Sequence, residues 1–88
     1  MKHVVMYGTA ACPYCVAARR LFGAKKVNFE DIRVDLEPPR RDEMRRRGGG
    51  HTVPQIWIGD QHVGGCDDLY ALERAGRLDP MLQEAPTP

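Results

Sequence analysis

The sequence has few of the features that mark secreted, membrane-bound or nucleic-acid-binding proteins. Its 88 residues contain three cysteines, an odd count that does not fit a small secreted module held together by disulfides. No apolar run approaches the roughly 20 residues of a membrane-spanning helix, and the first residues lack the apolar core of a signal peptide. We therefore expect a cytoplasmic protein without a membrane partner, in a reducing compartment where paired thiols cycle.

Neither sign of charge is in excess, since 13 lysines and arginines stand against 12 aspartates and glutamates and give a net charge of +1. Such a balance does not indicate a dedicated nucleic-acid binder. The basic run Arg45-Arg46-Arg47 is typical of the solvated face of a short helix. We expect no nucleic-acid partner.

The chain is too short for a large hydrophobic core and is predicted to form one domain. A hydrophobic content of 42% fits a compact fold. The last five residues are polar and rich in proline, so we expect a domain at residues 1–83 and a disordered tail at residues 84–88. We expect the domain to be a monomer.

Two cysteines, Cys12 and Cys15, lie where a short apolar run at residues 3–7 gives way to a helical pattern. Pro13 suits the first helical position, because an N–H there has no partner within the helix in any case. The unpaired N–H groups and the positive end of the helix dipole then lie at Cys12 and favour its thiolate. The thiolate is the reactive form, so Cys12 is predicted to be a nucleophile near neutral pH.

Cys15 lies one helical turn further on, close enough to Cys12 for a disulfide and more shielded from solvent. These features fit a thiol that resolves a mixed disulfide formed at Cys12. The alternatives are two inert thiols or half of a zinc site, but a structural zinc site needs four ligands. The further candidates are Cys66 and three histidines, none of them paired at ligand spacing. The strand–Cys-x-x-Cys–helix pattern therefore favours redox chemistry, and we expect no metal.

Apolar periodicity and turn residues predict the order β-α-β-α-β-β-α, followed by a last short helix. The first two strands and the helix between them form a parallel βαβ unit, and Gly59-Asp60 joins the last two strands in an antiparallel hairpin. This order predicts an α/β protein with a four-stranded mixed sheet and helices on both faces. Strands are predicted at residues 2–7, 28–35, 54–58 and 61–63, and helices at residues 13–23, 40–47, 67–75 and 78–83.

Details of the helices follow from the same patterns. Gly23 and Gly76 are predicted to end the first and third helices, and Cys66 or Asp67 to cap the third. Glycines 48–50 are predicted to form a flexible connector, since no phosphate-loop Lys-Ser/Thr follows them. Arg19 and Arg20 are predicted to face water, and the inner side of the first helix is assigned to Val16, Ala17, Leu21 and Phe22.

Three motifs occur in an order that resembles the glutaredoxin family, and more narrowly its small bacterial dithiol members. They are Cys12-Pro13-Tyr14-Cys15 after a strand, Thr52-Val53-Pro54-Gln55-Ile56, and Gly64-Gly65-Cys66-Asp67-Asp68-Leu69. The resemblance covers about residues 3–82. It implies a thioredoxin-like fold, in agreement with the predicted order of elements. It also implies a glutathione-dependent thiol–disulfide oxidoreductase that reduces protein disulfides and protein–glutathione mixed disulfides.

The resemblance also implies where glutathione binds. Thr52, Val53 and Pro54 would lie beside Cys12, with a cis Val53–Pro54 bond that presents the Val53 backbone to the tripeptide as an added strand. From the sequence alone, Pro54 can also simply begin a strand. The ring of Tyr14 would pack on the glutathione backbone.

The start of the third helix is the second part of the implied glutathione site. Gly65 and Cys66 precede Asp67 and Asp68 at this turn, and the family binds the γ-glutamyl end of glutathione here. Helix N–H groups suit its carboxylate and an Asp side chain suits its ammonium group. An ordinary acidic helix start is the alternative interpretation. Cys66 is expected to be a small packed or partly exposed thiol without a catalytic role.

One departure from the family concerns a lysine that many glutaredoxins have a few residues before the first cysteine. This sequence has Thr9-Ala10-Ala11 there. In the family that lysine lowers the pKa of the thiol and holds the glycyl carboxylate of glutathione. Arg46, Arg47 and His51 are the nearest substitutes on the side of the second helix.

The expected partners are glutathione, as a reducing co-substrate and not a bound cofactor, and proteins with disulfides or glutathionylated cysteines, with ribonucleotide reductase as one candidate. Two alternatives remain open. One is a glutaredoxin-like electron donor reduced by thioredoxin reductase, which the missing lysine favours and the Thr-Val-Pro and Gly-Gly-Cys-Asp-Asp motifs oppose. The other is an iron–sulfur cluster carrier that uses Cys12 and glutathione, which the presence of Cys15 opposes.

Overall fold

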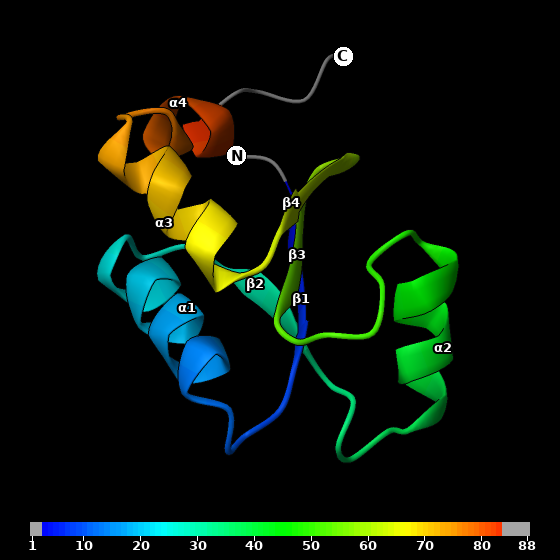
Figure 1. Cartoon of the computed structure of the whole chain (residues 1–88). Coiled ribbons are helices and arrows are strands. Elements are labelled where there is room, and N and C mark those ends of the chain that lie inside the picture. The colour runs from blue at the N-terminus through cyan, green and yellow to red at the C-terminus, as the bar shows by residue number, and fades with distance from the viewer. Residues whose placement is uncertain (1–2, 84–88) are drawn as a thin grey trace.

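A computed structural model describes residues 3–83 of the chain, and the tail predicted at residues 84–88 lies outside the described residues. Four strands and four helices follow one another in the predicted order (Figure 1). In chain order they are β1 (Val4–Gly8), α1 (Pro13–Ala24), β2 (Phe29–Arg33), α2 (Pro39–Arg46), β3 (Gln55–Ile58), β4 (Gln61–Gly64), α3 (Cys66–Arg74) and α4 (Leu78–Gln83). None of these helices is long and apolar enough to cross a membrane.

The four strands form one mixed sheet in the order β2-β1-β3-β4. β1 pairs with β2 in parallel and with β3 in antiparallel register, and β3 pairs with β4 in antiparallel register. The parallel βαβ unit and the antiparallel hairpin are therefore confirmed. The hairpin turn has a positive φ of 61° at Gly59, the first central position, as type II′ turns require.

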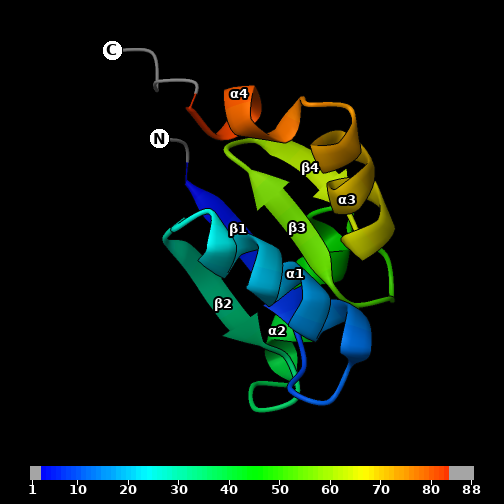
Figure 2. The ribbon, with the colours of Figure 1, turned by 90° about the vertical axis from the view of Figure 1, so that its left-hand side faces the viewer.

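Helices cover both faces of the sheet. Figure 1 shows the sheet nearly edge-on, with α2 on one side and α1, α3 and α4 on the other, and Figure 2 shows α1 and α3 in front of the strands. Side chains of a strand point alternately to its two faces, so the sheet supports two hydrophobic clusters. The first, under α1, α3 and α4, comprises Val4, Met6, Ala18, Phe22, Val27, Ile56, Ile58, Leu69, Leu78 and Leu82. The second, under α2, comprises Val5, Tyr7, Ile32, Val34, Met44 and Trp57.

On the side of the sheet covered by α2, the buried Tyr7 links β1 to this helix. The hydroxyl of Tyr7 donates to Glu43 at 2.5 Å and accepts from Arg47 at 3.0 Å. Burial and the Glu43 carboxylate together raise the pKa of Tyr7, which keeps the hydroxyl a donor. The Arg47 guanidinium also lies 4.5 Å from the ring centre of Trp57. These contacts fix the end of α2 against the sheet.

The first helix differs from its prediction in two respects. Its buried residues are Cys15, Ala18 and Phe22, whereas Val16 is 37% exposed, so the predicted inner side was wrong at Val16. The prediction did not count Cys15 among the apolar positions, so the predicted buried face of α1 was displaced by one residue.

The end of this helix was also predicted wrongly. Gly23 lies within α1, and the left-handed residue that ends the helix is Lys26, with φ 58°. The N–H groups of Lys26 and Val27 bond to the carbonyls of Gly23 and Phe22 at 3.0 Å each. This is the Schellman pattern, which usually has glycine at the left-handed position. Gly76 has that role after α3, as predicted, with φ 70°.

Gly49 is expected to tolerate a side chain poorly. A Cβ added there would lie 2.7 Å from a ring carbon of Trp57 and 3.0 Å from Met44. Overpacking of this kind typically costs about 1–3 kcal/mol, so Gly49→Ala should lower the free energy of unfolding by that amount in urea titrations. Gly23→Ala is the matched control, because nothing lies within 4 Å of its added Cβ. The control should stabilise α1 by roughly 0.5–1 kcal/mol, and an equal loss in both variants would contradict the prediction.

Candidate active site

Cys12 lies at the junction between the loop after β1 and helix α1. It has extended backbone angles as the N-cap residue, Pro13 occupies the first helical position, and the Cys12 carbonyl accepts the Val16 N–H at 3.0 Å. Cys12 is partly exposed, and its Sγ atom lies 3.9 Å from the carbonyl oxygen of Val53. The nucleophile predicted from the sequence therefore lies beside the predicted glutathione-binding segment Thr52-Val53-Pro54, although Val53 is 41 residues away in the chain.

The surroundings of Cys12 favour its thiolate. Burial by itself would raise the pKa of Cys12, but hydrogen bonds from the N–H of Cys15, the thiol of Cys15 and the N–H of Tyr14 lower it, and so does the charge of Arg19. The sum of these effects lowers the pKa below that of an ordinary cysteine. This direction favours the thiolate, which is the reactive form of a thiol, at Cys12.

Cys15 has the opposite character. It is fully buried, and its sulfur accepts the N–H of Thr9 at 3.5 Å. Burial, followed by the hydrogen bond and negative charge of Cys12, raises the pKa of Cys15. The sulfur also lies close to the main chain, since a Cβ added at Gly8 would be 3.0 Å from it. Cys15 is thus a shielded thiol next to an activated one.

Arg19 is a part of the site that sequence reasoning missed. Its guanidinium binds both carboxylate oxygens of Asp31 on β2, at 2.7 and 3.1 Å, and donates to the carbonyl of Thr9 at 2.9 Å. Its side chain is 21% exposed, so the prediction that Arg19 faces water was wrong. Arg19 follows Cys15 by four residues, and that spacing places both on one face of the helix. The spacing is the signal that could have revealed the role of Arg19.

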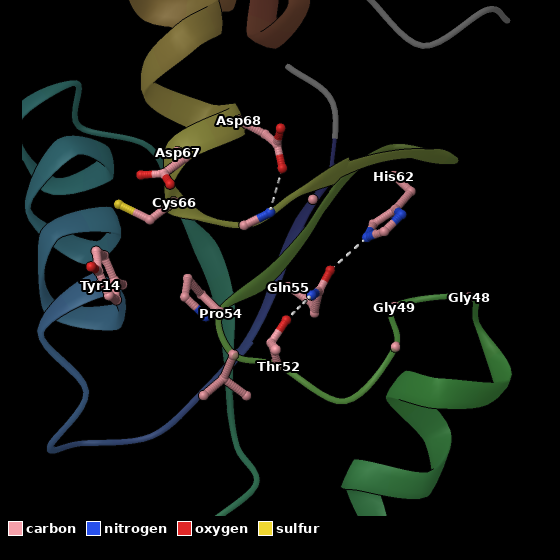
Figure 3. Close-up of a pocket in the computed structure, with 14 residues that line it drawn as sticks. Tyr14, Gly48, Gly49, Thr52, Pro54, Gln55, His62, Cys66, Asp67 and Asp68 are labelled. Atoms are coloured by element: carbon pink, nitrogen blue, oxygen red, sulfur yellow. Dashed lines mark hydrogen bonds between the residues drawn. The ribbon is translucent and has the colours of Figure 1, made fainter.

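A groove of about 440 Å³ extends from Tyr14 and the start of α3 across the start of β3 (Figure 3), and its lining includes Val53, whose carbonyl lies beside Cys12. It brings together every residue that the motifs assigned to glutathione: Tyr14, Thr52, Val53, Pro54, Gly65, Cys66, Asp67 and Asp68. The Val53–Pro54 bond is cis, as predicted. Tyr14 is 60% exposed at one side of the groove. Figure 3 shows Tyr14 and Thr52 on opposite sides of Pro54.

Asp67 and Asp68, the two aspartates at the start of α3, differ in their contacts. Gly65 is the N-cap and Cys66 the first helical residue, so the predicted cap at Cys66 or Asp67 was wrong. The Asp68 carboxylate accepts the Gly65 N–H at 3.1 Å (Figure 3) and so closes the helix start. Asp67 is exposed in the groove. Asp68 is exposed there as well, but its carboxylate is engaged by the Gly65 N–H, so the Asp67 carboxylate is the freer of the two to meet a ligand.

Cys66 is buried, and its pKa is raised by burial and by the charges of Asp67 and Cys12. These features describe a packed thiol, in line with its expected role. Among residues 3–83, no group of three or more His, Cys, Asp or Glu side chains is arranged to hold a metal ion.

The groove also extends further than the motifs indicated. Its lining includes Gln55 and His62, together with glycines 48–50. Figure 3 shows these residues on the far side of Pro54 from Tyr14 and Cys66. In contrast, the residues named as substitutes for the family lysine do not line the groove, and Arg47 is instead engaged with Tyr7 and Trp57.

Comparisons with known proteins identify the family. A family model described as glutaredoxin matches residues 4–63. A glutaredoxin of Pseudomonas aeruginosa is 57% identical over 82 residues, which are 93% of this chain and 98% of that protein. The chain belongs to the glutaredoxin family. Glutaredoxin 3 of Escherichia coli is 48% identical over 83 residues, which are 94% of this chain and 100% of that protein.

Solved glutaredoxin structures have the same fold. The solution structure of the Brucella melitensis glutaredoxin matches with a TM-score of 0.82 at 45% identity, over 100% of this chain and 96% of that one. The crystal structure of a buckwheat glutaredoxin–glutathione complex matches with a TM-score of 0.84 at 31% identity, over 92% of this chain and 76% of that one. The predicted thioredoxin-like fold and the predicted activity, that of a glutathione-dependent thiol–disulfide oxidoreductase, are confirmed.

Replacing Arg19 by glutamine is expected to raise the pKa of the Cys12 thiol, because the variant loses a positive charge that stabilises the thiolate. The thiolate forms above the pKa and disappears as the pH falls through it. The loss of reactivity should therefore begin at a higher pH in Arg19→Gln. The pH dependence of Cys12 alkylation measures this midpoint.

Arg20→Gln is the matched control. Arg20 is the exposed neighbour of Arg19 on the same helix, and its replacement by glutamine removes the same charge from the protein. Its alkylation midpoint should stay at the wild-type value. If Arg19→Gln keeps its fold and its midpoint does not move, the electrostatic role of Arg19 is refuted.

Proposed function

We propose that Cys12 is the attacking thiol of this glutaredoxin and Cys15 the resolving thiol. The observation that supports this most directly is the position of the Sγ atom of the partly exposed Cys12, 3.9 Å from the Val53 carbonyl at the edge of the groove. The lowered pKa of Cys12 and the raised pKa of the buried Cys15 support the same division of roles. Attack by a thiolate on a disulfide needs an exposed sulfur of low pKa.

In the proposed reaction on a protein disulfide, the Cys12 thiolate forms a bond to one substrate sulfur and the other substrate sulfur leaves as a thiolate. Cys15 then attacks Cys12, releases the second substrate thiol and closes the Cys12–Cys15 disulfide. Two glutathione molecules reduce that disulfide in turn and leave as oxidised glutathione. Two electrons therefore pass from glutathione to the substrate, and the enzyme returns to its dithiol form.

We infer that glutathione lies in the groove as an extended tripeptide. The Val53 backbone would pair with its main chain as an added strand, and the Tyr14 ring would cover it. The N-terminal N–H groups of α3 would receive the γ-glutamyl carboxylate, and the Asp67 carboxylate the ammonium group. The exposure of Asp67, compared with the engagement of Asp68 by Gly65, supports this assignment.

The proposed substrates are proteins with disulfides or glutathionylated cysteines, including ribonucleotide reductase as a candidate. A reducing cytoplasm would keep the pair in the dithiol form, with Cys12, Cys15 and Cys66 all free, as they are in this structure. We propose a monomer as the working form, since the residues assigned to both steps come from one chain.

The two cysteine roles predict different defects. Cys15→Ser should retain deglutathionylation, because attack on the glutathione sulfur releases the protein thiol and a second glutathione frees Cys12. It should lose most reduction of disulfides within a protein, because Cys15 acts at high effective concentration on the tethered substrate. Cys12→Ser should lose both activities. Assays of both variants on both substrates, coupled to glutathione reductase and NADPH, measure this.

If Cys15→Ser keeps its fold and loses deglutathionylation, the monothiol route is absent. The mechanism would then be closer to that of thioredoxins. Activity of Cys12→Ser on either substrate would refute its assignment as the attacking thiol.

A matched pair of variants at α3 tests the glutathione assignment. Asp67→Ala should raise the KM for glutathione by an amount equal to about 1–3 kcal/mol, the cost of a lost hydrogen bond to a charged group. It should leave the melting temperature unchanged, because Asp67 is exposed. Asp68→Ala should lower the melting temperature, because Asp68 closes the helix start. An unchanged KM in Asp67→Ala would mean that the ammonium group binds elsewhere.

A further inference from the structure

Gln55 is the only buried polar side chain among the described residues, at 6% exposure. It follows Pro54 directly, at the first position of β3. A buried amide must find hydrogen-bond partners, since leaving its donor or acceptor unpaired is costly. Both ends of the Gln55 amide have partners in this structure. Its Nε2 lies 3.0 Å from the Thr52 hydroxyl, and its Oε1 lies 2.7 Å from Nε2 of His62 (Figure 3).

The two contacts of the Gln55 amide determine which group donates and which accepts in each hydrogen bond. An amide oxygen only accepts and an amide nitrogen only donates. With Nε2 of Gln55 donating to Thr52, the ring nitrogen of His62 that faces Oε1 must be the protonated one. The chain therefore runs from His62 to Gln55 to Thr52. Since the Thr52 oxygen accepts from Gln55, its own proton is left to donate to a ligand in the groove.

His62 is well placed to fix this arrangement from outside the core. It lies on β4 opposite Trp57, and its ring stacks on the Trp57 ring at 4.5 Å between centroids with 25° between the planes. The stacking sets the ring plane, and the ring edge then points at Gln55 (Figure 3). The side chain is largely exposed, so burial does not explain its presence. The stacking contact and the hydrogen bond are separate interactions that different substitutions can remove.

We propose that His62 is a positioning residue for the docking segment Thr52-Val53-Pro54. By holding the Gln55 amide in one orientation, it fixes the Thr52 hydroxyl and the start of the segment whose Val53 carbonyl lies beside Cys12. This proposal rests on the proposed glutathione groove and assigns it a residue that none of the three motifs singled out. His62 acts through Gln55 on glutathione binding and takes no part in the thiol chemistry.

Three substitutions separate the two contacts of His62. His62→Phe keeps an aromatic ring to stack on Trp57 and removes the hydrogen-bond donor. His62→Gln loses the ring but supplies an amide nitrogen the same number of bonds from Cα as the imidazole Nε2. His62→Asn is the matched amide control, because its nitrogen is one bond short of that position. The hydrogen bond predicts that Gln rescues function and that Phe and Asn do not.

Steady-state assays measure the KM for glutathione and the kcat of each variant. The melting temperature and the alkylation rate of Cys12 are measured for the same variants. We expect KM to rise about two- to tenfold in His62→Phe and His62→Asn, the range for one lost hydrogen bond. His62→Gln should stay near the wild-type KM, and the alkylation rate should be unchanged in all three. Gln61→Ala, an exposed neighbour on β4, should change none of these values.

Two outcomes overturn the proposal. A wild-type KM in His62→Phe would show that the hydrogen bond is not needed, and a KM raised as much in His62→Gln as in His62→Asn would show that an amide donor at the Nε2 position does not restore glutathione binding. Either result leaves the proposed function standing, provided that the wild-type protein uses glutathione and Cys12→Ser does not. Failure of the wild-type protein to show a saturable glutathione dependence would instead refute the proposed groove itself.

Discussion

The antiparallel pairing of β1 with β3 is the constraint on which the site depends. In this register Tyr7 lies opposite Gln55, so the end of β1 meets the beginning of β3. The loop after β1 leads to Cys12, and the segment before β3 contains Val53. The pairing therefore brings the Cys12 thiol to within 3.9 Å of the Val53 carbonyl, and the buried side chains of both strands hold them there.

The same junction explains why two neighbouring cysteines differ in chemistry. Cys12 is at the first turn of α1, where backbone N–H groups lack partners within the helix and stabilise a negative charge. Cys15 is one turn inside, where it is fully buried. A single helix start thus produces one thiol with a lowered pKa and one with a raised pKa. Arg19, clamped between Asp31 and Thr9, adds a fixed positive charge to this arrangement.

The sheet also divides the groove into two regions. The side toward α1 and α3 contains the aromatic ring of Tyr14 and the acidic start of α3, whereas the side toward α2 contains Gln55 and His62 (Figure 3). The paired strands β3 and β4 supply Gln55 and His62 to the second region. The register of these strands places His62 beside Trp57. In the proposed arrangement, the first region would offer charge and helix N–H groups to glutathione, and the second would orient the segment Thr52-Val53-Pro54. Both regions meet at the cis Val53–Pro54 bond.

The sequence by itself determined the order of elements and the pair of cysteines at a helix start, because these follow from apolar periodicity, proline and glycine within a few residues of one another. It also determined the family, through three local motifs. It did not determine which side of α1 is buried, since alanines and a cysteine leave the apolar face ambiguous, and Val16 was misplaced for that reason. Only the tertiary structure decided that Arg19 turns to Asp31, that Asp68 closes the helix start at Gly65 and that His62 reaches Gln55. Each of those contacts joins side chains whose directions depend on strand register and helix packing, which no short stretch of sequence encodes.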